Sequence, residues 1–121
     1  MNIAAEFVMH LFHARTAAHV MHLTALSYAQ HKALEDFYEG IVGLADSFAE
    51  TYQGAYGALL PFEGTPYFHP TSAIGTFTDL RTWIARNRDH VCDKDDSTLQ
   101  NIIDEIQALI SSTLYKLRFL K

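Results

Sequence analysis

The chain has 121 residues, of which 49% are hydrophobic, and its formal net charge at pH 7 is -5. This length and composition predict one domain over residues 1–121 with a buried core, and they exclude a disordered or collagen-like chain. The negative charge argues against nucleic acid or an anionic membrane as a partner, and the single cysteine, Cys92, excludes an internal disulfide and favours the cytoplasm.

Four amphipathic helices follow one another along the chain. Apolar residues at helical spacing predict the first helix over residues 3–23. Charged residues and histidines interrupt its apolar run, so this segment is expected to be neither a signal peptide nor a membrane span. Thr24 and Ser27 are candidate N-caps for a second helix, which is expected over residues 27–53. A third is expected over 76–91, and a fourth over 97–119, capped by Asp96 or Ser97. Strand signals are nearly absent, so the fold class is all-α.

One long connector, residues 53–75, separates the two halves and holds all three prolines and four of the six glycines. Its aromatic content predicts that it packs against the helices. The short turns make the first and second helices, and the third and fourth, antiparallel hairpins, while the connector is long enough to run the length of the bundle. This pattern predicts a four-helix bundle with ferritin-like connectivity.

The second helix carries one histidine and several carboxylates at regular offsets. With His31 at zero on a helical wheel, Glu35 falls at about 40°, Asp46 at about 60° and Glu50 at about 100°, whereas the apolar stripe centres at about 280°. The axial rise places Glu35 and Asp46 about 16 Å apart, too far for one metal ion. The residues therefore form two half-sites, His31 with Glu35 and Asp46 with Glu50.

Two half-sites of one helix can meet if a second copy packs antiparallel across a two-fold axis. His31 and Glu35 of one chain would then face Asp46 and Glu50 of the other, and a homodimer would carry two such sites. Imidazole nitrogen with carboxylate oxygen suits iron, manganese or zinc. The alternative is a solvated helix face, which Lys32 would share.

The span "HVMHLTALSYAQHKALEDFYEGIVGLADSFAETY" resembles the starvation-type DNA-protecting ferritins (Dps), a branch of the ferritin-like superfamily. The second helix of that family reads His-x-x-x-Asp/Glu, then ten intervening residues, then Asp-x-x-x-Glu. This pattern falls on His31, Glu35, Asp46 and Glu50 without a gap. A histidine near the end of the family's first helix corresponds here to His22 or to His19. His19 keeps the spacing to His31, and His22 fits better as the residue that opens the turn.

The resemblance implies an inter-subunit metal site that oxidises ferrous iron and passes ferric iron to a hollow shell of subunits. A dimer without a cage is also compatible with the sequence, and so is a ferroxidase-type activity. The chain departs from the family in its shorter length and in the absence of a lysine-rich N-terminal tail. It also lacks the tryptophan that follows the first histidine in the family, where Val20 or Leu23 stands instead. These departures favour the alternative function, a non-catalytic helical scaffold that acts through protein contacts.

Other titratable residues fit no site pattern. His10 and His13 share a face of the first helix and are expected to be packing or surface residues, because no Glu-x-x-His motif on the fourth helix completes an intrachain di-iron site. Cys92 stands in no catalytic pattern, and Trp83 is expected to be a core residue of a solvated third helix.

Overall fold

The computed structural model describes residues 2–62 and 72–120, and these residues form four helices and no strand. The helices are α1 (Ile3–Leu23), α2 (Tyr28–Tyr56), α3 (Ala73–Val91) and α4 (Ser97–Phe119). The all-α prediction is confirmed, and the predicted bounds of the first and fourth helices are those observed.

Each helix begins at a capping side chain that accepts a hydrogen bond from the backbone N–H three residues on. These caps satisfy one of the free N–H groups of the first turn. The distances are 2.9–3.2 Å, and the caps are Asn2, Ser27, Ser72 and Asp96. Ser27 and Asp96 were predicted as caps. The Ser72 cap explains why α3 begins three residues before the predicted position.

The helix α2 ends later than predicted, at Tyr56 rather than at residue 53. Gly57 follows it in the left-handed conformation, with φ of 66°, and donates its N–H to the Gln53 carbonyl at 2.9 Å. A glycine adopts this conformation without the steric cost that a side chain would add, so it terminates the helix.

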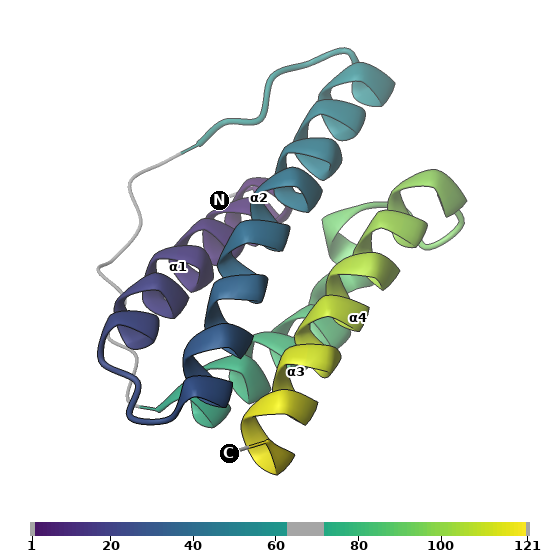
Figure 1. Ribbon diagram of the computed structural model, residues 1–121. Helices are drawn as coiled ribbons and strands as arrows, with labels where there is room; N and C mark the ends of the chain where they lie inside the picture. Colours follow the sequence, from purple (N-terminus) through teal and green to yellow (C-terminus); the bar gives the residue numbers. More distant parts are fainter. Residues whose placement is uncertain (1, 63–71, 121) are drawn as a thin grey trace.

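The helices form a bundle in which α1 packs on α2 and α3, and α4 packs on α2 and α3. Figure 1 shows that the hairpin partners α1 and α2 run antiparallel, as do α3 and α4, while α2 and α3 point in the same direction. The predicted hairpins are therefore present. The predicted connector falls partly on residues 63–71, which lie outside the described residues; of its described part, Leu60 is buried and donates its N–H to Gln53 Oε1 at 2.9 Å.

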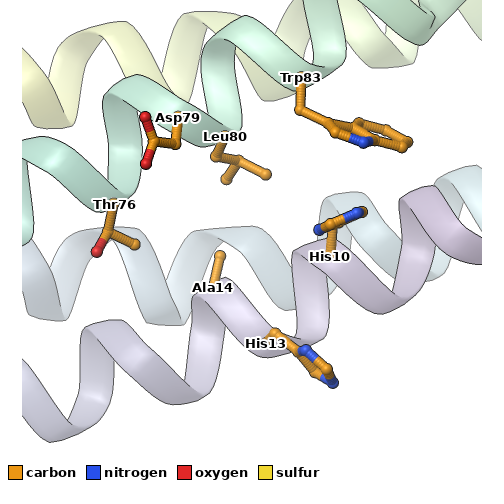
Figure 2. A pocket seen from close by; sticks show the side chains of 7 residues that line it. All are labelled: His10, His13, Ala14, Thr76, Asp79, Leu80 and Trp83. Carbon is orange, nitrogen blue, oxygen red and sulfur yellow. The ribbon is translucent and has the colours of Figure 1, made fainter. Parts of the chain in front are cut away.

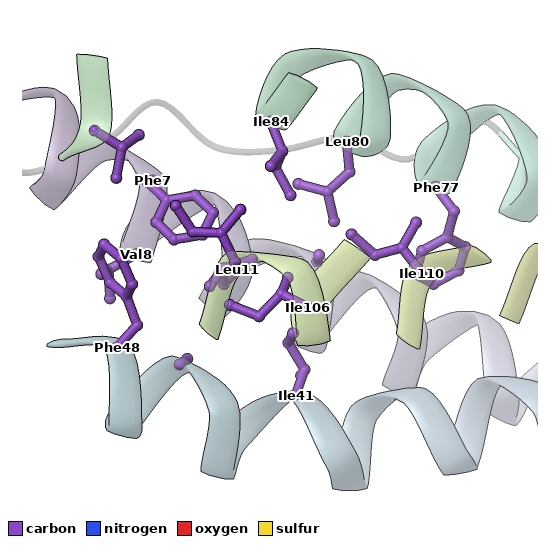
Figure 3. Close-up of a cluster of buried hydrophobic side chains, with 14 of the residues drawn as sticks. Phe7, Val8, Leu11, Ile41, Phe48, Phe77, Leu80, Ile84, Ile106 and Ile110 are labelled. Atoms are coloured by element: carbon purple, nitrogen blue, oxygen red, sulfur yellow. The ribbon is translucent and has the colours of Figure 1, made fainter. Parts of the chain in front are cut away.

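One continuous hydrophobic core holds all four helices together (Figure 3). Aromatic rings meet edge to face across it, Phe7 with Phe48 at 4.8 Å between centroids and Phe37 with Phe77 at 4.5 Å. Such pairs add to the burial of apolar area, which is the main term that favours folding. Among the described residues, α2 and α4 supply eight of the twelve largest fully buried side chains: Leu34, Phe37, Ile41, Phe48, Leu99, Ile103, Ile106 and Ile110.

The turn between α3 and α4 is fastened by a reciprocal pair of side chains. Arg88 donates from Nε to Gln100 Oε1 at 2.8 Å and from Nη2 to the Gln100 carbonyl at 3.1 Å. Gln100 donates from Nε2 to the Arg88 carbonyl at 3.2 Å and to Cys92 Sγ at 3.3 Å. Because each side chain bonds the backbone of the opposite helix, the two helix ends are held in register.

None of the helices in residues 2–62 and 72–120 combines the length and the apolar character that crossing a membrane would require.

Candidate functional site

The turn between α1 and α2 brings together His22, near the end of α1, and His31, in the first turns of α2. Their rings stack with centroids 3.7 Å apart and planes inclined by 25°. His22 Nδ1 lies 2.8 Å from the His31 carbonyl oxygen, and His31 Nδ1 lies 3.0 Å from the His22 carbonyl oxygen. We call this arrangement the histidine clasp.

The histidine clasp fixes which ring nitrogen carries the proton. A carbonyl oxygen can only accept a hydrogen bond, so each Nδ1 must be the N–H donor. In the neutral rings the lone pair is then on Nε2, and neither Nε2 takes part in a hydrogen bond with another described residue. A histidine whose Nδ1–H is held by a backbone carbonyl is the form in which imidazole binds metals through Nε2.

His19 lies one turn before His22 on α1 and is exposed. Its ring stacks on Tyr38 of α2 at 4.2 Å and 16°, and it is 6.0 Å from the His22 ring. The Tyr38 ring also meets His22 edge-on at 5.3 Å. The structure therefore places His22 directly against His31, whereas the ring contacts of His19 are with Tyr38 and His22.

Glu35 follows His31 by one turn of α2 and is half-buried. It forms an ion pair with Lys32 of the same helix. The hydrogen bond from Lys32 lowers the pKa of Glu35, and the nearby His22 and His31 lower it further, while burial opposes them. The same bond raises the pKa of Lys32. Glu35 is therefore an ionised carboxylate with a resident cation, and a metal ion at this position must compete with Lys32.

Asp46 and Glu50 lie further along α2, both exposed. Neither makes a hydrogen bond or an ion pair with any residue of the described chain. Asp46 is fifteen residues beyond His31, which corresponds to about 22 Å along a straight helix. Within the described residues, no three histidine, cysteine, aspartate or glutamate side chains gather as a group that could hold a metal ion. Within one chain, the two predicted half-sites are therefore too far apart to bind the same metal ion.

The histidine clasp was not predicted, because it depends on contacts between residues nine apart across a turn, for which helical periodicity gives no signal.

The pairing of His10 with Trp83, away from the clasp, was not predicted either. The two rings lie 4.4 Å apart at 45°. His10 Nε2 also lies 3.6 Å from Glu6, and burial lowers the pKa of His10, against the opposing effect of Glu6. The prediction that His10 is a packing residue agrees with this geometry.

Comparison with known proteins gives one family. The chain matches the Family of unknown function (DUF5856) over residues 22–117, which is most of its length. The chain belongs to this family. The DUF5856 match begins at His22 and contains His31, Glu35, Asp46 and Glu50, whereas His19 and the rest of α1 precede it. No curated protein and no solved structure matches the chain significantly.

Proposed function

We propose that this chain binds iron, or a similar divalent transition metal such as manganese or zinc, at a site shared between two copies related by a two-fold axis. The chemistry would be the oxidation of ferrous iron as substrate, which the resemblance to the starvation-type ferritins implies. The observation that carries the proposal is the histidine clasp, because it holds both rings through Nδ1 and leaves each Nε2 without a hydrogen-bond partner among the described residues, one turn of α2 from Glu35.

The clasp also reduces the cost of binding. The two Nδ1–H···O=C bonds hold both rings before any metal arrives, so less side-chain entropy is lost when a ligand binds. Nδ1 hydrogen bonds of this kind also raise the basicity of the ligating nitrogen. His22 is the stronger candidate for the second nitrogen ligand, since its ring lies against His31. His19 is close enough to remain in the proposed set.

The oxygen ligands would come from both chains. Glu35, ionised and adjacent to the clasp, would be supplied by the chain that supplies the histidines. Asp46 and Glu50 would be supplied by the second copy, where they are exposed and unpaired within the described residues. Carboxylates stabilise a ferric product, and neutral imidazole suits the ferrous state.

Two further observations support a second copy at this end of the bundle. Four exposed apolar side chains lie within a few residues of the clasp histidines in sequence, and exposed apolar groups of this kind are typical of a contact site. They are Val20, Leu23, Leu26 and Tyr28. In addition, the helices that pack on each other are antiparallel and α2 and α3 point in the same direction, which is the arrangement expected of a ferritin-like fold (Figure 1).

The first experiment separates the two half-sites by mutation. One variant, H22N/H31N, removes both Nε2 atoms while asparagine can still donate to the clasp carbonyls. The other, D46A/E50A, removes the carboxylates at the far end of α2. The matched control is E39Q, an exposed carboxylate on the same helix that is outside the proposed ligand set. Binding of Fe(II) without oxygen, and of Zn(II), is measured by calorimetry, with light scattering for the number of subunits.

The second experiment tests whether the site is shared. The two variants carry different affinity tags, are co-expressed, and the hybrid dimer is purified through both tags. In a two-fold dimer, one hybrid site has intact histidines from one chain and intact carboxylates from the other, and the second site has neither. We expect no metal on either variant alone and one site per hybrid dimer. A hybrid that stays inert, or a D46A/E50A protein that binds as the parent does, would overturn the proposal.

The alternative function, a non-catalytic scaffold, also has an observation in its favour. The clasp bonds both helix ends to each other, so the fold alone gives His22 and His31 a role. A scaffold predicts that the parent protein binds no metal more tightly than H22N/H31N does. The calorimetric comparison therefore decides between the two functions.

A further inference from the structure

A cavity of about 140 Å³ lies between α1 and α3, on a different side of α1 from the histidine clasp. Figure 2 shows His10 and Ala14 rising from α1 toward Leu80 and Trp83 of α3, with Asp79 beside Leu80 and Thr76 one turn before it, away from Trp83. The small side chain of Ala14 leaves this space open, because its neighbours on both helices are larger. The proposal below does not depend on the metal site.

The lining combines an apolar body with one charged end. Leu80, Ala14 and the faces of Trp83 and His10 supply the apolar walls. The Asp79 side chain is exposed at the rim and makes no hydrogen bond or ion pair with another residue in the described part of the chain. His13 of α1 also lines the cavity, whereas Glu6, whose carboxylate lies 3.6 Å from His10 Nε2, is not among the described lining residues.

We propose that this cavity binds a small organic cation with an apolar body about the size of benzene and an ammonium group directed at Asp79. The size follows from the volume, since an apolar cavity of about 150 Å³ accommodates a benzene molecule. The charge follows from the Asp79 carboxylate, the acidic group among the described lining residues, which favours a cation over an anion. The flat rings of Trp83 and His10 suit a planar body.

The His10 ring supports the same charge preference. Burial lowers its pKa, so the ring is neutral at pH 7 and adds no positive charge to compete with a cationic ligand.

The test uses three compounds of nearly equal size and shape: benzylamine as the cation, benzyl alcohol as its neutral counterpart, and benzoate as the anion. Trp83 is the single tryptophan of the chain, so its fluorescence reports on the cavity itself. N-acetyltryptophanamide under the same conditions corrects for direct quenching. We expect a saturable change with benzylamine, a weaker one with benzyl alcohol, and none with benzoate.

Two variants test the placement. D79N removes the charge at the rim and should weaken benzylamine about fivefold while leaving benzyl alcohol within about twofold, as for a partly exposed ion pair. D89N is its control, an exposed aspartate on the same helix. A14L fills the cavity and should abolish binding of both compounds; A108L, at an exposed position of α4, controls for the added leucine.

Each outcome decides. Equal binding of benzoate and benzylamine, or no saturable change with any of the three, overturns the proposal. Unchanged binding by a folded A14L protein, judged by its helical circular dichroism, also overturns it, because the ligand would then lie elsewhere. If A14L does not fold, the D79N comparison still tests the assignment, since an exposed carboxylate can be replaced by its amide without disturbing the core.

Discussion

Replacing His22 by asparagine, and separately by alanine, separates the structural role of the histidine clasp from its proposed ligand role. His22 is only 7% exposed, and its Nδ1 donates to the His31 carbonyl at 2.8 Å. Asparagine carries an N–H donor near the position of Nδ1 but has nothing at the position of Nε2. His22→Asn should therefore keep the backbone bond and lose the metal-binding nitrogen, whereas His22→Ala loses both.

The magnitudes follow from the contacts. An internal hydrogen bond contributes about 1 kcal/mol to stability, so the alanine variant should be about 1 kcal/mol less stable than the asparagine variant. Both variants lose the stacked ring, and the space left by a buried side chain adds to the loss, giving about 2–3 kcal/mol for alanine. For a chain of this size, 1 kcal/mol corresponds to a melting-temperature difference of about 4 °C.

The assay is urea unfolding followed by circular dichroism, with the dependence on urea compared between variants to detect changes in the unfolded state. The same proteins are titrated with Zn(II). His90→Asn and His90→Ala, at an exposed position of α3, are the matched controls. Equal stability of the two His22 variants would refute the hydrogen-bond role. Zinc affinity at the parent level in His22→Asn would refute the role of Nε2.

Three further outcomes are expected. Lys32→Met should tighten Zn(II) binding about two- to fivefold, because it frees Glu35 from its resident cation, and unchanged affinity would show that Glu35 is not a ligand. Gly43→Ala should raise the free energy of unfolding by about 1 kcal/mol, because an added Cβ at Gly43 meets nothing within 4 Å, whereas at Gly40 it would lie 3.3 Å from Leu109. A Gly43→Ala monomer less stable than the parent would contradict this prediction. Burial raises the pKa of Cys92 from 9.0 to about 11. At pH 8, iodoacetamide should therefore alkylate the thiol of the native protein about a hundredfold more slowly than that of the urea-unfolded protein, and equal rates would contradict the burial of Cys92.

The sequence predicts the helices well because periodicity and caps are local. The bounds of α1 and α4 follow from the apolar repeat and from Asp96, and the burial of the α2 stripe follows from its spacing. The start of α3 is earlier than predicted, since the proline- and glycine-rich residues before it conceal the Ser72 cap. The close approach of Leu109 of α4 to Gly40, where an added Cβ would lie 3.3 Å away, is a contact between two helices that the periodicity of one helix does not predict.

The site could be predicted only in part. The shared face of His31, Glu35, Asp46 and Glu50 is a property of one helix, so a wheel finds it. The bonds of the histidine clasp are a property of two helices and their turn, and they require the direction of each ring. The cavity next to Trp83 likewise depends on which face α3 turns toward α1, and no pattern in either helix alone specifies that. Whether two copies meet remains a prediction.

Both helix turns are fastened in the same way, by a pair of polar side chains that each bond the other helix's backbone: His22 with His31, and Arg88 with Gln100. Each hairpin can thus close within its own short stretch of chain, and a short loop costs little entropy to close. Assembly of the molecule then reduces to the docking of two preformed halves, so we expect folding at the fast end of the range for domains of this length.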